Sequence, residues 1–203
     1  MCYILDCEDG ASLYYGVKKE ISREELKRRI EDHTILDVLN KVSVHKGDVF
    51  FIEAGTIHAI GAGIVICEIQ QNSNTTYRVY DYDRRDASGN LRELHIDKAL
   101  EVAKLSPNAQ YKKGEEAIET PEYKKEWLGA CKYFTSYEWN VKTEAPLPLT
   151  NDSFLSIVIV EGEGVIEKGE EKLSFKKGDS LFIPAQEGIV RIKGTCRIVT
   201  TQI

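Results

Sequence analysis

The pattern of hydrophobic and polar positions predicts a chain made mostly of short strands. Runs of β-branched and aromatic residues recur along the 203 residues, and each is followed by Gly, Asp or Asn. Such runs, bounded by turn-forming residues, are typical of short antiparallel strands. The runs that we interpret as strands are CYILD, SLYYG, VFFIE, IVICEI, TYRVYDY, FLSIVIV, LFIPA and CRIVTTQI.

Two segments depart from this pattern and show the spacing of apolar residues that is typical of a helix. The first covers about residues 22–40 and opens with Ser22, followed three residues later by Glu25, which is a capping box. The second runs from His95 to Leu105 and is closed by a proline two residues later. We therefore expect a mainly β protein with helical insertions.

An internal repeat is the most informative feature of the sequence. Residues 42–55, VSVHKGDVFFIEAG, align without a gap with residues 173–186, LSFKKGDSLFIPAQ, and both read as strand, Lys-Gly-Asp turn, strand. Upstream, residues 4–16 resemble residues 157–169, and the first helical segment accounts for the greater distance between the blocks in the first copy. One block would be weak evidence, because Gly-Asp turns are common in β proteins, but two in the same order favour a duplicated barrel. Strand, turn, strand, small residues and then a histidine is the order of the second half of a cupin barrel.

Composition and charge narrow the classes of function. The formal net charge of −6 argues against nucleic-acid binding, which normally needs a basic face. No stretch approaches the roughly 20 consecutive apolar residues that span a bilayer, and the first residues lack the basic start and apolar run of a signal peptide. We therefore expect no membrane association and a cytoplasmic location. The five cysteines form an odd set without a CxxC pair, and we interpret them as small packing residues.

His58 is the candidate metal ligand of the first copy. It follows a strand and a Gly-Thr turn, and Ile189 takes the matched position in the second copy, which contains no histidine. Neutral imidazole is the commonest metal ligand, but a catalytic zinc needs about three protein ligands and an open position. The other histidines, His33, His45 and His95, lack ligand spacing to His58. On the residues alone, a hydrogen-bonded structural role for His58 stays open.

The run GTIHAIGAGIVICEIQQNSNTTYRVYDYDR, residues 55–84, closely resembles the signature region of bacterial type I mannose-6-phosphate isomerases. The opening CYILDCEDGASLYYG and the closing weak barrel are also similar to that family, so the resemblance covers nearly the whole chain. Members of the family interconvert mannose 6-phosphate and fructose 6-phosphate with one zinc ion held in a cupin barrel. The resemblance implies that His58 is the last zinc ligand in chain order. It also implies that Arg78 is an active-site cation and that Glu68 is an acidic residue close to the pocket.

The family's remaining zinc ligands are a Gln and a His in a Q-x-H element and a Glu that precedes the first strand, and none has a counterpart in this chain. The resemblance therefore implies a cupin-like (jelly-roll) double barrel whose first barrel and zinc site are incomplete, and a fragment with reduced or no activity alone. We expect residues 1–92 to form the C-terminal part of the first, catalytic barrel, residues 93–109 a helical linker, and residues 110–203 a second, metal-free barrel. Open barrel edges expose unpaired strands, so we also expect self-association through them.

The chemistry of an aldose–ketose isomerase suggests roles for these residues. Moving a carbonyl between neighbouring sugar carbons passes through an enediol, whose developing negative charge a fixed guanidinium such as Arg78 can stabilise. The planar fork of arginine also suits phosphate oxygens, so Arg78 and Arg84 are candidate substrate-binding residues. A solvated turn is the alternative for both Arg84 and Arg85, and it explains Arg85 better. Glu68 alternates with apolar neighbours on a strand. It is a candidate acid or base if its face is the barrel interior, and a plain surface residue otherwise.

Two other functions compete with the isomerase. A non-catalytic cupin module would bind a sugar or sugar phosphate without needing a metal. A cupin metal oxygenase would need two histidines and a carboxylate around one metal ion, a cluster that this chain cannot assemble. For both the isomerase and the non-catalytic module, the expected partner is a small-molecule sugar phosphate.

Overall fold

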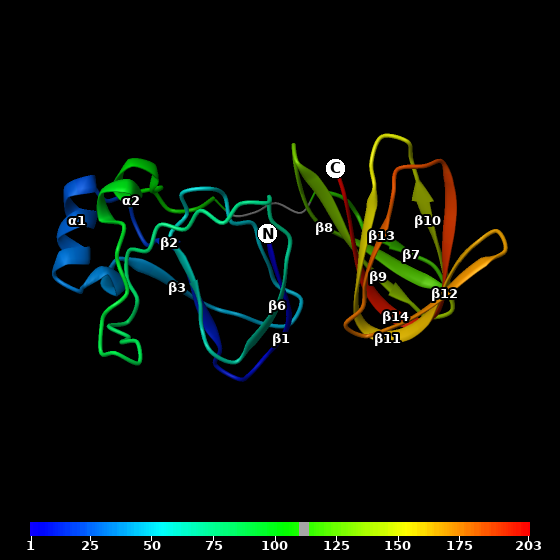
Figure 1. Cartoon of the computed structure of the whole chain (residues 1–203), viewed down its shortest axis with the longest axis horizontal. Helices are drawn as coiled ribbons and strands as arrows, with labels where there is room; N and C mark the ends of the chain where they lie inside the picture. The colour runs from blue at the N-terminus through cyan, green and yellow to red at the C-terminus, as the bar shows by residue number, and fades with distance from the viewer. Residues whose placement is uncertain (110–113) are drawn as a thin grey trace. The chain divides into compact units, whose positions relative to one another are not determined.

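The computed structural model describes residues 1–109 and 114–203, and the chain divides into two compact units, Met1–Tyr111 and Lys112–Ile203 (Figure 1). Every strand pairing in the described residues is antiparallel, which confirms the expected mainly β fold. The predicted border at residue 110 lies outside the described residues, and the subdivision into two barrels and a linker stays a prediction. In the described part of the chain, no helix has the length and apolar character needed to cross a membrane.

Residues 1–109 of the first unit form two small sheets and two α-helices. Its elements are β1 (Cys2–Cys7), β2 (Ser12–Val17), α1 (Arg23–Glu31), the 3₁₀-helix η1 (Ile35–Asp37), β3 (Leu39–Ser43), β4 (Val49–Phe50), β5 (His58–Ile60), β6 (Ile64–Glu68) and α2 (Ile96–Val102). One sheet has the strand order β4-β1-β6 and the other the order β3-β2-β5. Both sheets contribute side chains to one apolar cluster around Ile4 and Leu13, which are buried.

Helix α1 begins where the capping box predicts but ends earlier than expected. The backbone N–H of Glu25 donates to Oγ of Ser22 at 3.1 Å, which satisfies one of the free donors of the first turn. The helix expected over about residues 22–40 is wrong beyond Glu31. Its end has a local cause, because His33 adopts a φ of 56° in the left-handed region, and the chain then turns into η1 and β3.

Helix α2 is also shorter than expected. It covers Ile96–Val102 instead of residues 95–105, because Ala103 already has an extended backbone with φ −64° and ψ 135°. The side chain of Leu100 packs against the apolar cluster around Leu26 of α1, so the two helices lie side by side within the first unit (Figure 1). The segment expected to link two barrels therefore contributes a packed helix to the first unit.

The predicted strand TYRVYDY, residues 76–82, is wrong. The structure forms no strand there, and Tyr82 and Asp83 have φ angles of 55° and 53° in the left-handed region, where a strand cannot continue. The backbone of this segment bonds to His95, partly through the imidazole ring, where a strand would bond to a neighbouring strand. The N–H of Arg78 donates to Nδ1 of His95 at 3.0 Å, and the N–H of His95 donates to the carbonyl of Arg78 at 2.8 Å.

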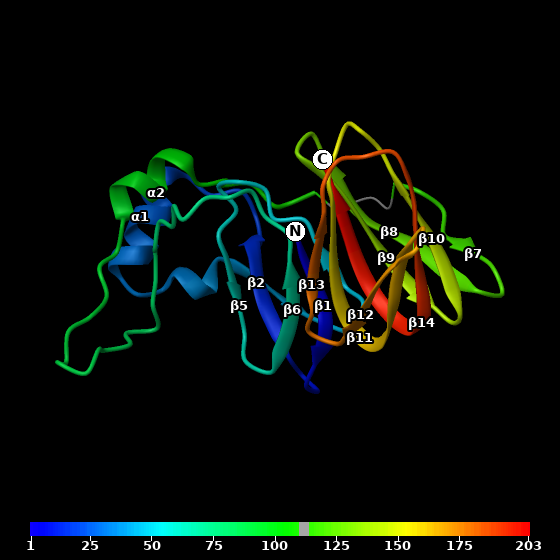
Figure 2. The same ribbon diagram turned by 45° about the vertical axis from the view of Figure 1, so that its right-hand side comes forward.

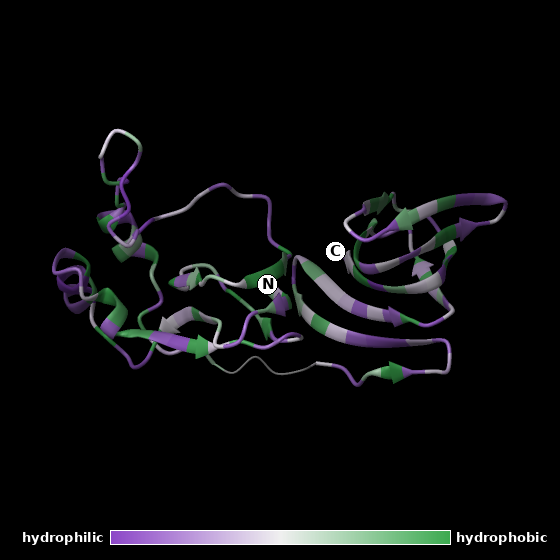
Figure 3. Cartoon of the chain, turned by 90° about the horizontal axis from the view of Figure 1, so that it is seen from below, coloured by the Kyte–Doolittle hydropathy of each residue, from purple (hydrophilic) through white to green (hydrophobic). Residues whose placement is uncertain are grey.

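In the second unit, the described residues 114–203 form one sheet of eight strands. Its elements are β7 (Ile118–Glu119), β8 (Tyr123–Cys131), β9 (Phe134–Val141), β10 (Glu144–Leu149), β11 (Leu155–Lys168), β12 (Glu171–Lys176), β13 (Ser180–Ile183) and β14 (Gly188–Gln202). The main order is β12-β11-β14-β9-β8-β7, with β13 pairing with β11 and β10 with β14. The long strands β11 and β14 run side by side (Figure 2). Hydrophobic and hydrophilic residues alternate along the strands (Figure 3), and the inward-facing Ile157, Ile192 and Ile198 are completely buried.

The repeat seen in the sequence is present in the backbone of both units. In the first copy the N–H of Ile4 donates to the carbonyl of Asp48 at 2.9 Å, and in the second the N–H of Ile159 donates to the carbonyl of Asp179 at 2.9 Å. The glycine of each turn donates back to the same isoleucine at 2.9 Å, and the strand register shifts just after each isoleucine. Ile4 therefore corresponds to Ile159, two residues beyond the position that the sequence alignment gives it.

Candidate functional site

His58 opens β5, and its side chain is exposed. It lies opposite Tyr15 of β2, and directly opposed residues share one face of a sheet. Tyr15 packs against the apolar cluster around Ile4, so His58 is on the face that carries this cluster. The Nδ1 atom of His58 lies 2.9 Å from the carbonyl oxygen of Thr56. When Nδ1 is protonated and donates to this carbonyl, the lone pair of Nε2 is free for a metal or a proton.

Glu68 ends β6 opposite Cys2 of β1. The Sγ atom of Cys2 lies 3.8 Å from Oε1 of Glu68, and burial, followed by the negative charge of Glu68, raises the pKa of Cys2 to about 11. Ile66, two residues earlier on β6, packs against the cluster around Ile4. Because side chains alternate along a strand, Glu68 points to that same face. Its role as an acid or base stays a prediction.

A row of side chains connects these two candidates. Cys2 lies opposite both Glu68 and Phe50, and the ring of Phe50 meets the ring of Tyr15 edge-on, with centroids 5.5 Å apart. Tyr15 in turn lies opposite His58. The structure therefore places His58 and Glu68 on one face that spans both small sheets of the first unit.

These side chains do not form a zinc site by themselves. Among the described residues there is no group of three or more His, Cys, Asp or Glu side chains that could hold a metal ion. A catalytic zinc needs about three protein ligands, and a thiol binds it as the thiolate. His58 can offer one imidazole, and burial raises the pKa of the Cys2 thiol, which disfavours its thiolate in the metal-free protein. Among the described residues, His58 is thus a candidate ligand of a zinc site that they do not complete.

The predicted arginines meet at a buried carboxylate that the sequence patterns did not single out. Asp81 is 8% exposed, and its Oδ1 accepts a hydrogen bond from Nη2 of Arg84 at 2.5 Å and one from Nη1 of Arg92 at 3.5 Å. Nε of Arg78 lies 3.9 Å from the same oxygen. The hydrogen bond from Arg84, helped by the charges of all three guanidinium groups, holds the pKa of Asp81 below its ordinary value.

Arg78 is the least exposed of the three arginines around Asp81. Its side chain is 20% exposed, compared with 64% for Arg84 and 52% for Arg92. Nη1 of Arg78 donates to the carbonyl of Glu93 at 3.0 Å, and the backbone of Arg78 bonds to both the ring Nδ1 and the N–H of His95. Arg78 is thus fixed against the residues that lead into α2.

Arg85 has a different environment from its neighbour Arg84. Its Nη1 donates to the carbonyl of Gly89 at 2.7 Å, and Arg85 and Leu91 form an isolated antiparallel bridge that closes the loop between them. These contacts agree with the interpretation of Arg85 as part of a turn.

The structure sorts the predicted site residues into two groups, and their roles stay predictions. His58 and Glu68 share the face around Ile4, whereas Arg78 and Arg84 converge on Asp81; the hydrogen bonds and ion pairs of the described residues do not join the two groups. The sequence did contain a signal for Asp81, which has an arginine three residues before it and another three residues after it. Arg92 carries no such signal, since the fold alone brings it to Asp81.

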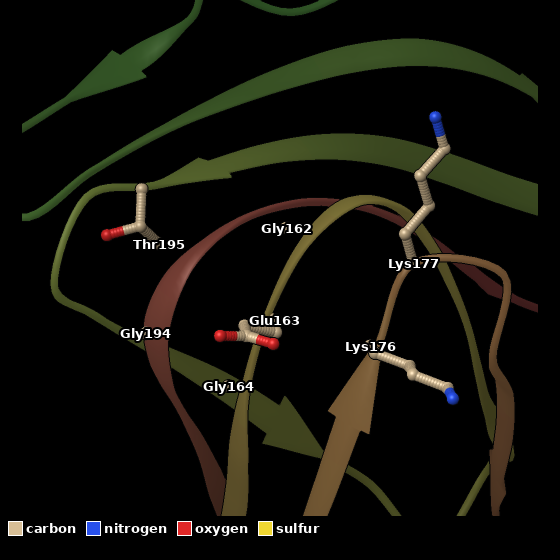
Figure 4. A pocket seen from close by; sticks show the side chains of 7 residues that line it. All are labelled: Gly162, Glu163, Gly164, Lys176, Lys177, Gly194 and Thr195. Carbon is tan, nitrogen blue, oxygen red and sulfur yellow. The ribbon is translucent and has the colours of Figure 1, made fainter.

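The second unit has an open hollow of about 800 Å³ over its sheet (Figure 4). Gly162, Gly164 and Gly194 line it where β11 and β14 approach closely, and a Cβ at Gly162 would lie 2.1 Å from a backbone oxygen of β14. Lys176 and Lys177 also line it, but their side chains point in different directions (Figure 4). The hollow therefore follows from the missing side chains of the glycines and not from converging polar groups.

Comparison with known proteins identifies the fold and the relatives of this chain. Residues 124–203 match the family model described as the cupin domain of mannose-6-phosphate isomerase, so the second unit is a cupin domain. The chain is 40% identical to the mannose-6-phosphate isomerase ManA of Bacillus subtilis over 99% of its own length and 63% of the relative's. It is 35% identical to the mannose-6-phosphate isomerase of Streptococcus mutans over 90% of this chain and 56% of the relative.

The solved structures agree with these matches. The crystal structure of the mannose 6-phosphate isomerase from Bacillus subtilis superposes with a TM-score of 0.91 at 34% identity, covering 100% of this chain and 63% of that chain. The protein is thus a cupin-fold protein with helical insertions. Its sequence is similar to those of bacterial mannose-6-phosphate isomerases along almost its whole length, which confirms the resemblance described above. It spans somewhat less than two thirds of the length of the curated relatives that it matches.

Proposed function

We propose that this chain takes part in the interconversion of mannose 6-phosphate and fructose 6-phosphate, as the portion of an aldose–ketose isomerase that carries His58, Glu68 and Arg78. The observation that supports this function is the 40% identity to a mannose-6-phosphate isomerase over 99% of the chain. The signature run that contains all three residues lies within the matched length.

In this proposal the candidate side chains of the first unit have separate roles in the reaction. Isomerisation removes a proton beside the substrate carbonyl and returns it to the neighbouring carbon, which needs an acid–base group and a fixed positive charge. Glu68 is the proposed acid–base group. The proposed cation is Arg78, held by Glu93 and Asp81, while the more exposed Arg84 binds the substrate phosphate.

We further propose zinc as the cofactor, with His58 as one of its ligands. A zinc-bound mannose 6-phosphate isomerase has a fold similar to this chain, with a TM-score of 0.70 at 16% identity. Zinc held at such a site would polarise the sugar carbonyl. Because His58 is the one zinc ligand that we propose among the described residues, the chain alone should hold zinc weakly and catalyse little conversion.

A hybrid protein tests this function. The part of Bacillus subtilis ManA that this chain does not span is joined to the chain, and conversion of mannose 6-phosphate to fructose 6-phosphate is measured together with bound zinc. We expect turnover by the hybrid, little turnover by the chain alone, and loss of both zinc and turnover in the hybrid carrying His58→Ala. His45→Ala is the matched control, since His45 lies in the exposed turn after β3. A folded, zinc-containing hybrid without turnover would refute the isomerase.

A non-catalytic sugar-phosphate-binding module is the second candidate, and the lack of a metal-binding group among the described residues favours it. It predicts saturable binding of mannose 6-phosphate to the chain alone, unchanged by a chelator. Calorimetric titration with and without chelator separates the two functions.

Two properties accompany the proposal. We propose a cytoplasmic location, supported by five cysteines that are all free. We also propose self-association through β5 and β6, since each pairs with a single strand among the described residues and Ile60 and Val65 on them are 38% and 57% exposed. Light scattering that finds only monomers at high protein concentration would contradict the proposed self-association.

A further inference from the structure

The arginine cluster has an uneven arrangement around its single carboxylate. Arg84, Arg92 and Arg78 all approach Oδ1 of Asp81. Oδ2 of Asp81 is buried and has no hydrogen-bond partner among the described residues. A buried acceptor without a partner costs folding free energy, and such costs are concentrated at functional sites. The position of Asp81 is therefore not explained by stability alone.

The cluster also carries more positive charge than it neutralises. Three guanidinium groups face one carboxylate, which leaves a surplus of two positive charges. The surplus is accessible at Arg84 and Arg92, whose side chains are 64% and 52% exposed, whereas Asp81 itself is buried. Paired arginine forks with free donors are suited to the oxygens of a phosphate dianion.

Asp81 sets the geometry of both exposed arginines. Nη2 and Nε of Arg84 donate to Oδ1 and to the backbone carbonyl of Asp81, at 2.5 and 3.3 Å. Arg92 comes from the far side of the loop closed by Arg85 and Leu91 and reaches the same carboxylate. Without this shared acceptor, two long side chains from separate segments would have no common point of attachment.

We propose that Asp81 is a positioning residue that holds Arg84 and Arg92 together as a binding site for the phosphate group of a sugar phosphate, with Arg92 as a second phosphate-binding residue. The site deepens the proposed function and rests on it for the identity of the sugar. The binding of phosphate itself is tested separately.

Whether Asp81→Asn strengthens or weakens phosphate binding distinguishes a positioning role of Asp81 from a purely electrostatic one. Asp81→Asn keeps the size of the side chain and removes its negative charge, so the surplus of the cluster rises from two to three positive charges. If the arginines acted only through charge, inorganic phosphate would bind more tightly to this variant. If Asp81 positions them, phosphate binds about tenfold or more weakly, because oriented charge-assisted hydrogen bonds are lost.

Calorimetric titration of the full chain with inorganic phosphate, mannose 6-phosphate and mannose provides the measurement. We expect saturable binding of the two phosphates and none of mannose, with about tenfold losses in Arg84→Gln and Arg92→Gln. Arg85→Gln is the matched control, since it removes the same charge from the adjacent turn position and should leave binding unchanged. Arg92→Lys, which keeps the charge but not the fork, should recover binding only in part.

The outcomes are decisive in both directions. Equal or tighter phosphate binding by Asp81→Asn, or no saturable binding by the unmodified chain, overturns the proposal. Should circular dichroism show that Asp81→Asn does not fold, the exposed Arg92→Gln decides: lost binding supports the site and unchanged binding overturns it. An inactive hybrid isomerase whose phosphate binding is intact would contradict the proposed function alone.

Discussion

Gly162 offers a prediction whose magnitude can be worked from the structure. It has a φ of 77° in β11, opposite Cys196 of β14, and an added Cβ would lie 2.1 Å from the carbonyl oxygen of Thr195. Gly169, in the turn between β11 and β12, has a φ of 60°, but an added Cβ would meet nothing within 4 Å. Gly162→Ala and Gly169→Ala therefore share the conformational strain and differ in the clash.

The difference between the two variants isolates the steric cost. A left-handed backbone costs an alanine about 1–2 kcal/mol, and replacing glycine restricts the unfolded chain, which offsets about 0.4–1 kcal/mol. Both contributions are common to the pair. The clash with a backbone atom of a paired strand cannot be relieved by a side-chain rotation, and overpacking of this kind costs about 1–3 kcal/mol. We expect Gly162→Ala to be less stable than Gly169→Ala by that amount.

Tryptophan fluorescence is a selective assay for this difference. The sequence contains two tryptophans, Trp127 and Trp139, and both belong to the second unit. Each kcal/mol should lower the melting temperature of a unit of this size by about 4–8 °C. Guanidinium unfolding gives the free energies directly. If the two variants lost the same stability, the close approach of β11 and β14 would not be the reason for a glycine at this position.

Three further predictions concern other parts of the fold. A hydrogen bond from Lys193 holds the pKa of Glu167 at about 2, below its value in the unfolded chain, so Glu167 adds stability that is lost as the pH falls from about 4.5 towards 2. Glu167→Gln should flatten the acid limb of stability against pH, and an unchanged limb would contradict this. Burial raises the pKa of Cys196 to about 11, so iodoacetamide should label it slowly in the folded protein and quickly in urea, as read by mass spectrometry. Ser22→Ala should cost about 1 kcal/mol by removing the cap of α1, seen as faster hydrogen exchange of the helix amides; equal exchange would show that the cap bond to Glu25 contributes little.

The sequence predicted the elements that depend on local patterns. The repeat, the capping box and most apolar strands follow from short-range signals, and each is present in the structure. Strands β5 and β7 to β10 were missed. Pro146 and Pro148 make β10 hard to predict as a strand, although it pairs with β14 along one edge and buries the alternate residues Ala145 and Leu147.

The site could be predicted only where residues are close in sequence. The signature run contains His58, Glu68, Arg78 and Arg84 in one continuous motif. The structure divides them: the first two share the face around Ile4, and the two arginines contact Asp81. Arg92 reaches Asp81 across eleven residues of sequence through a loop closure that no periodicity indicates. The prediction of a strand over residues 76–82 was wrong for a related reason: the backbone of Arg78 bonds to His95 and not to another strand.

The matching turns of the two copies share a backbone hydrogen bond but differ in one side chain. In each turn the aspartate accepts the N–H of the residue three positions earlier, His45 or Lys176, at 2.8 Å, and this bond involves only the backbone of that residue. The side chain at that corner is therefore free to differ while the path of the chain stays the same. A doubled scaffold of this kind can evolve new chemistry on one copy, because the other copy and the shared corners preserve the shape.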